Sequence, residues 1–224
     1  MHRRWQKKQP RNFVQFAFLK ANPYFCKSEC AAATTPKPHK VTTTLLMTQT
    51  IFLIGYMGCG KSTLGAALAS VMNVPFIDLD DYIEEKCEAK ITEIFRTMGE
   101  TAFRQLEQQA LREVADMPCI VACGGGTPCF EGNMQLMNRT GITIWLTTEV
   151  ERIAARLCLP EQKAKRPLIA NKTDEEIHAF ITTQLAARTP FYSQAQLQFD
   201  STHIETAPDT LHTATQLAAI LQNL

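Results

Sequence analysis

From Thr50 onwards, short apolar runs alternate with longer stretches in which apolar residues recur at helical spacing. The apolar runs predict five buried strands: TIFLIG, VPFIDLD, PCIVAC, ITIWLT and LQFDS. The stretches between them predict helices over residues 61–72, 81–87, 91–98, 100–116, 131–138, 149–156, 173–194 and 208–222. Alternating strands and helices are typical of an α/β fold, a three-layer sandwich around a mainly parallel sheet.

One stretch, CLPEQKAKRPLIANK, is basic and has no apolar period, and it predicts a mobile loop. In parallel sheets of this kind, ligands bind beyond the carboxyl ends of the strands. Gly55, Asp80 and Gly124 stand at three such predicted ends. We therefore expect a binding site where these three residues meet.

Charge divides the chain into two unlike parts. Residues 1–46 hold nine Lys and Arg against one acid, while the remainder holds 14 against 21, although the net charge is only +1. We predict a basic, disordered extension over 1–46, or translated sequence before a start at Met47, followed by one domain over 47–224. A transit peptide and a nucleic-acid-binding arm are the alternatives. The sequence has no run of about 18 apolar residues, so we predict no transmembrane helix.

Eight cysteines are spread along the chain without a Cys-x-x-Cys pair. The cluster of Cys119, Cys123 and Cys129 does not have the spacing of a common structural zinc site. We expect buried thiols in a reducing cytosol instead.

The segment Gly55–Ser62, GYMGCGKS, has the pattern of a phosphate-binding loop between a strand and a helix. Its glycines let successive backbone N–H groups face a phosphate, and the helix N-terminus adds its positive end. Lys61 can neutralise phosphate oxygens, and the Ser62 hydroxyl can ligate magnesium. This loop indicates nucleotide binding but does not identify the acceptor.

Two acids end the second predicted strand. Asp78 and Asp80 would point to the same face if both lay in a strand, so that one could hold magnesium through water and the other could face the acceptor. A helix cap is the structural alternative.

Arginines and a glycine run complete the candidate chemistry. Arg104, Arg166 and Arg188, if gathered around one site, would suit an acceptor with a carboxylate, since guanidinium binds this group bidentately. Arg104 could instead simply pair with Glu107 three residues later. Gly124-Gly125-Gly126 would leave backbone amides open to a ligand, or would serve as a hinge.

The segments GYMGCGKST, FIDLDDYIE, ITEIFRTMGETAFRQLE, ACGGG, RPLI and RTPFY occur in this order, and the chain resembles the shikimate kinase family over residues 49–224. The resemblance implies a nucleoside-monophosphate-kinase-like fold with a five-stranded parallel sheet of order 2-3-1-4-5. It also implies MgATP-dependent phosphorylation of the 3-hydroxyl of shikimate. Residues 157–171 would form the lid, and residues 81–110 the shikimate-binding region.

The resemblance implies a role for each candidate residue. The catalytic groups would be Lys61, Asp80 and Arg166. ATP would be bound by Gly58, Cys59, Gly60, Lys61, Ser62, Thr63, Arg156 and Arg166. Shikimate would be bound by Asp80, Arg104, Gly125, Gly126 and Arg188. Magnesium would be held by Ser62 and, through water, by Asp78.

A related small-molecule kinase, such as a gluconate kinase, and a non-catalytic nucleotide-binding relative are the alternatives. The retained Lys61, Asp80 and Arg188 argue against the second of these. We expect a cytoplasmic monomer whose partner is shikimate, with neither nucleic acid nor membrane as a partner.

Overall fold

The computed structural model describes residues 49–164, 166 and 168–224, all within one compact unit, Leu45–Leu224. The basic extension predicted over residues 1–46 lies outside the described residues. The sheet strands are β1 (Thr50–Ile54), β2 (Phe76–Asp78), β3 (Ile120–Ala122), β4 (Gly141–Thr147) and β5 (Leu197–Asp200). All four pairings are parallel, and the strand order is β2-β3-β1-β4-β5. The predicted fold class and strand order are confirmed.

Helices connect the strands along the chain. Their bounds are α2 (Lys61–Met72), α3 (Leu79–Cys87), α4 (Ile91–Val114), the short 3-10 helix η1 (Thr127–Cys129), α5 (Asn133–Thr140), α6 (Val150–Leu157), α7 (Pro160–Ala164), α8 (Asp174–Tyr192) and α9 (Ala207–Leu221). Among the described helices, none is long and apolar enough to cross a membrane.

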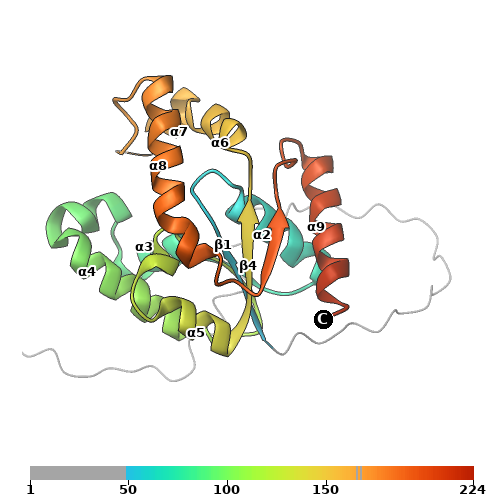
Figure 1. The fold of residues 1–224 in the computed structure, drawn as a ribbon. Coiled ribbons are helices and arrows are strands. Elements are labelled where there is room, and N and C mark those ends of the chain that lie inside the picture. Colours follow the sequence, from blue (N-terminus) through green and yellow to red (C-terminus); the bar gives the residue numbers. More distant parts are fainter. Residues whose placement is uncertain (1–48, 165, 167) are drawn as a thin grey trace, which may run out of the picture. The chain divides into compact units, whose positions relative to one another are not determined.

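The central strand β1 shows why the fold has three layers. Side chains alternate across a strand, and all five residues of β1 are buried, so both of its faces are covered. Ile51 and Leu53 belong to the core cluster that includes α2 and α9. Phe52 and Ile54 belong to the cluster that includes α4, α5, α6 and α8. Figure 1 shows α9 on the opposite side of the strands from α5 and α8.

The second strand is shorter than predicted. It ends at Asp78, and Leu79 already begins α3. Asp78 is the N-cap of this helix and accepts a hydrogen bond from the backbone N–H of Asp80 at 3.1 Å. The expectation that both acids share one face of a strand is therefore wrong, because capping turns the chain into a helix between them.

Two further elements differ from the predicted pattern. The helices expected over 91–98 and 100–116 run together as α4, interrupted at Gly99, where φ is 79°. The loop expected over CLPEQKAKRPLIANK, residues 158–172, contains the short helix α7. None of the residues of α7 is buried, so the sequence there had no apolar period to reveal a helix.

Candidate active site

The phosphate-binding loop leads directly from β1 into α2. Gly60 is the N-cap of α2 with φ of 92°, and a side chain there would overlap Ile204, so glycine is required on both counts. The ammonium group of Lys61 donates to the carbonyl oxygens of Gly55 and Tyr56, each at 2.9 Å. Lys61 thus lies over the loop, at the N-terminus of a helix, where an anion is favoured.

Residues after β5 hold the outer side of this loop. The Ser201 hydroxyl donates to the carbonyl oxygen of Cys59 at 2.8 Å. Arg156 donates to the carbonyl oxygens of Gly58 and Thr202, at 2.9 Å each, and pairs with Glu205 at 3.1 Å. The structure thus places Arg156 beside the loop, where it ties the loop to the segment after β5. No local signal in the sequence pointed to Ser201.

The predicted magnesium ligands lie together. The Ser62 hydroxyl donates to the Asp78 carboxylate at 2.5 Å, which joins the first turn of α2 to the end of β2. Thr63, the next residue, is exposed in the same turn. Hydroxyl and carboxylate oxygens are hard ligands of the kind that Mg²⁺ prefers, and Mg²⁺ needs few protein ligands because it retains water. This pair therefore fits a magnesium ion.

Asp80 has an unusual acidity. Its pKa is raised to about 6, chiefly because surrounding protein desolvates the carboxyl group, and further because Asp78 and Glu107 are negatively charged. Lys61 opposes this shift. Nevertheless, the side chain remains exposed on one side. A carboxylate with this pKa is suited to accept a proton near neutral pH.

The three consecutive glycines after β3 each lie against a different predicted acceptor-site side chain. A Cβ on Gly124 would be 2.7 Å from Oε1 of Glu107, 3.0 Å from the Thr127 hydroxyl and 3.2 Å from Oδ1 of Asp80. A Cβ on Gly125 would be 3.2 Å from Nη1 of Arg188, and one on Gly126 would be 2.6 Å from Nη2 of Arg104. The glycine run therefore brings together a carboxylate and two guanidinium groups from three separate helices.

Arg104 is held by acids. It donates to Oε2 of Glu107 at 2.8 Å and to Glu100 at 3.3 Å. Glu107 is only 1% exposed, and its other oxygen accepts from the Thr127 hydroxyl at 2.5 Å. The intrahelical pair expected as the structural alternative exists, yet Arg104 also lies against Gly126. The pair with Glu107 is confirmed, and the acceptor-binding role of Arg104 stays a prediction.

Arg188 is held differently, by groups without charge. Its guanidinium carbon lies 5.3 Å from the centre of the Tyr56 ring, and it donates to Gln184 at 3.2 Å. One turn later on α8, the Tyr192 hydroxyl donates to the carbonyl oxygen of Gly125 at 2.6 Å. Tyr192, which anchors the glycine run to α8, was missed as a site residue, although it lies in the segment RTPFY.

Arg166 lies within the lid segment. It donates to the backbone oxygen of Gln162 at 3.0 Å and to the side-chain oxygen of Gln162 at 2.5 Å. Burial lowers the pKa of its guanidinium group. Its described hydrogen bonds stay within the lid, so the structure does not bring Arg166 to Lys61.

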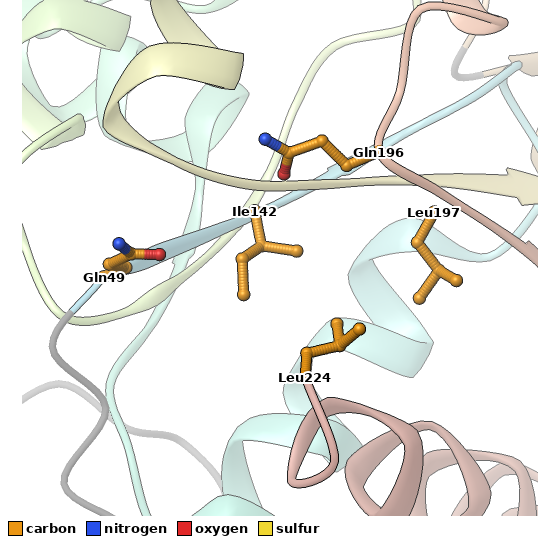
Figure 2. A pocket seen from close by; sticks show the side chains of 5 residues that line it. All are labelled: Gln49, Ile142, Gln196, Leu197 and Leu224. Carbon is orange, nitrogen blue, oxygen red and sulfur yellow. The ribbon is translucent and has the colours of Figure 1, made fainter.

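A pocket of about 370 Å³ opens at the other edge of the sheet. Figure 2 shows the side chains that line it, which are Gln49, Ile142, Gln196, Leu197 and Leu224. They lie at the amino ends of β1, β4 and β5 and at the last residue of the chain. The lining consists of two amide and three aliphatic side chains and includes no charged side chain. This pocket therefore lacks the carboxylate and guanidinium groups that lie at the carboxyl edge of the sheet.

The sheet is parallel and has this strand order, a phosphate loop follows β1, and candidate acceptor-binding groups follow β2 and β3. Together these features define a P-loop phosphotransferase with a nucleoside-monophosphate-kinase-like fold. Within this class, the chain belongs to the shikimate kinase family, because the model of that family, "Shikimate kinase", matches residues 57–222. The chain is therefore an ATP-dependent kinase.

Individual relatives agree with the family model. The shikimate kinase of Bacteroides thetaiotaomicron is 47% identical over 156 residues, which are 69% of this chain and 88% of that protein. The shikimate kinase of Parabacteroides distasonis is 42% identical over 172 residues, covering 76% of this chain and 98% of its own.

Solved structures agree as well. The crystal structure of the Bacteroides thetaiotaomicron shikimate kinase has a TM-score of 0.74 at 43% identity, covering 78% of this chain and 98% of that one. The Acinetobacter baumannii shikimate kinase in complex with shikimate has a TM-score of 0.66 at 31% identity, covering 80% and 97%.

Proposed function

We propose that this kinase transfers the γ-phosphoryl group of MgATP to the 3-hydroxyl of shikimate, giving shikimate 3-phosphate and ADP. The observation that carries the proposal is the glycine run, whose three members lie against Asp80, Arg188 and Arg104. An acceptor with one carboxylate and several hydroxyls suits two guanidinium groups and a carboxylate. Family membership supports the same acceptor.

Each group at the site has a defined task. The loop amides of Gly58–Ser62 and the ammonium of Lys61 bind the phosphates. Ser62 and Asp78 would hold magnesium, directly and through water, and the ion would neutralise phosphate charge. Asp80 orients the acceptor hydroxyl and takes its proton. Because phosphoryl transfer has a loose transition state, positioning and charge neutralisation supply most of the catalysis.

The two arginines would set acceptor specificity. Arg104 and Arg188 grip the carboxylate, while the backbone of Gly125 and Gly126 approaches the ring. A sugar acid such as gluconate lacks the rigid ring that would place a hydroxyl against Asp80 at the same time, so we expect it to be a poor acceptor.

The lid and the helix α6 before it supply the remaining groups of the nucleotide side. Arg166 would move from Gln162 to the phosphates on lid closure, which would also exclude water. Arg156 would line the adenine side, where it already joins the loop to the segment after β5.

We further propose that the enzyme acts as a monomer in the cytoplasm. The six cysteines of the described residues, Cys59, Cys87, Cys119, Cys123, Cys129 and Cys158, are free thiols, which suits a reducing compartment. Light scattering on the purified chain would test the oligomeric state.

The deciding experiment measures ADP release with MgATP and shikimate, gluconate or no acceptor. We expect release that depends on shikimate, from the full chain and equally from a variant that lacks residues 1–46. Release that is independent of shikimate, or greater with gluconate, would contradict the proposal. A difference between the two proteins would give the extension a part in catalysis.

A further inference from the structure

Tyr56 occupies an unusual place in the phosphate-binding loop. It is the second residue of the loop, yet its side chain is only 1% exposed. It belongs to the core cluster that also contains Ile181 and Tyr192 of α8. A residue of the nucleotide-binding loop therefore extends its ring into the layer that carries the acceptor arginine.

The ring lies beneath Arg188. At 5.3 Å between the guanidinium carbon and the ring centre, the two groups are within cation–π distance. Burial raises the pKa of Tyr56 to about 12, so the phenol is neutral near pH 7. The attraction thus comes from the face of the ring and leaves the positive charge of Arg188 available to a carboxylate.

The surroundings of Arg188 make this contact important. Within the described residues, its side chain donates to the Gln184 amide, has the Tyr192 hydroxyl as a second neutral hydrogen-bonding neighbour, and forms no ion pair with an acid. Gly125 also lies close to the guanidinium, since a Cβ there would be 3.2 Å from Nη1 of Arg188 and 3.5 Å from the backbone N of Met57. The ring of Tyr56 adds an aromatic face to these neutral contacts, and this face restricts the orientation of the guanidinium.

The hydroxyl group of Tyr56 gives no structural reason for a tyrosine at this position. Its oxygen is buried and has no hydrogen-bond partner among the described residues. Burying an unpaired hydroxyl is unfavourable, so phenylalanine would fill the same space without that cost. Removing the hydroxyl therefore separates its contribution from that of the ring.

We propose that Tyr56 is a positioning residue for the acceptor carboxylate, acting through the face of its ring on Arg188. The same residue accepts a hydrogen bond from Lys61 through its carbonyl oxygen, at 2.9 Å. One residue of the loop thus contacts both the phosphate-binding lysine and the acceptor-binding arginine. The inference rests on the proposed function, since it assumes a carboxylate acceptor such as shikimate.

The test compares ring variants of the full chain in the shikimate assay. A cation–π contact of ordinary strength predicts that Tyr56→Leu raises the KM for shikimate about 3- to 10-fold, with little change in the KM for ATP. Tyr56→Phe retains the ring and should keep the wild-type KM. Phe52→Leu, which changes another buried aromatic of the same cluster, is the matched control for lost packing.

Two further measurements keep the test decisive if Tyr56→Leu fails to fold. Pentafluorophenylalanine at position 56 keeps the shape of the ring but removes the negative charge of its face, so it should raise the shikimate KM as the leucine does. In an Arg188→Ala background, none of these changes should affect the KM further, because a double-mutant cycle isolates the pair.

Three outcomes would each overturn the inference. The first is an unchanged KM for shikimate with the fluorinated ring, and the second is a rise in KM in Tyr56→Phe equal to that in Tyr56→Leu. The third is an effect on KM that persists undiminished in the Arg188→Ala background. Loss of shikimate dependence in the wild-type chain itself would instead overturn the proposed function. The two failures are therefore distinguishable.

Discussion

The two sides of the active site are built in different ways. On the proposed nucleotide side, most of the groups are backbone groups of one short loop, and their geometry follows from glycines such as Gly60 and from the start of α2. On the acceptor side, side chains from α3, α4 and α8 converge on the glycine run after β3. A backbone site is encoded locally, whereas a side-chain site depends on the groups that hold each side chain in place.

The acceptor side itself contains two different supports. Arg104 is held by the buried carboxylate of Glu107, whereas Arg188 lies on the neutral ring of Tyr56. An acid partner fixes an arginine firmly but competes with the substrate carboxylate for its charge. An aromatic partner holds it less strongly and leaves the charge free. The comparison suggests that Arg104 chiefly shapes the site and that Arg188 supplies more of the substrate affinity.

The largest effect should come from Asp80→Asn, which removes the proton acceptor. We expect kcat to fall by roughly 10²- to 10⁴-fold, the usual contribution of a general base, with ADP binding unchanged. Turnover of the variant and calorimetric titration with ADP would measure both. Wild-type turnover would remove Asp80 from the mechanism.

Stability provides the control for this variant. Because the pKa of Asp80 is raised to about 6 in the fold, the folded state binds more protons than the unfolded state below that pH. The contribution of this group to stability is complete below its unfolded pKa and is lost as pH rises through about 6. Asp80→Asn should therefore be at least as stable as wild type at pH 7, and thermal unfolding would show it.

Among the changes on the acceptor side, Glu107→Ala should lower the free energy of unfolding most. It leaves half-buried Arg104 and the Thr127 hydroxyl without their shared buried partner, and breaking such a pair typically costs about 3–5 kcal/mol. Urea unfolding would measure the loss. Glu100→Gln is the matched control, because Glu100 is 71% exposed and such surface pairs are worth about 0–1 kcal/mol. Equal losses in the two variants would refute the support assigned to Glu107.

Arg188→Ala should instead act on binding. We expect the KM for shikimate to rise by the equivalent of roughly 2–5 kcal/mol, the usual cost of losing a buried charge partner, while the KM for ATP stays near wild type. Steady-state kinetics with each substrate varied would separate the two. An unchanged KM for shikimate would remove Arg188 from the site and would reverse the comparison with Arg104.

The smallest effect concerns pH. Protonation of Asp80 should reduce kcat/KM for shikimate as pH falls through about 6, by roughly tenfold between pH 7 and 5. Because the charge of Glu107 raises the pKa of Asp80, Glu107→Gln should shift this acid limb to lower pH. A pH–rate profile of both proteins would test the direction, and a shift to higher pH would contradict it.

The accuracy of the sequence predictions follows the range of the interactions involved. The phosphate loop and the five strands were predicted correctly, because apolar runs and glycine motifs are encoded in consecutive residues. The strand order was predicted correctly from the resemblance to the shikimate kinase family. The end of β2 was predicted wrongly, because one capping hydrogen bond from Asp80 to Asp78 turns the chain into α3. The helix α7 was missed, since it buries no residue.

The sequence by itself determined a phosphate loop, a parallel α/β sheet and the residue types that an acidic acceptor needs. Only the tertiary structure decided how these residues are supported. It joined Thr127 to Glu107, placed Tyr192 on Gly125, and laid Tyr56 beneath Arg188. Secondary structure depends on near neighbours in the chain. The orientation of a buried charged or aromatic side chain depends instead on partners tens of residues away, which only packing brings together.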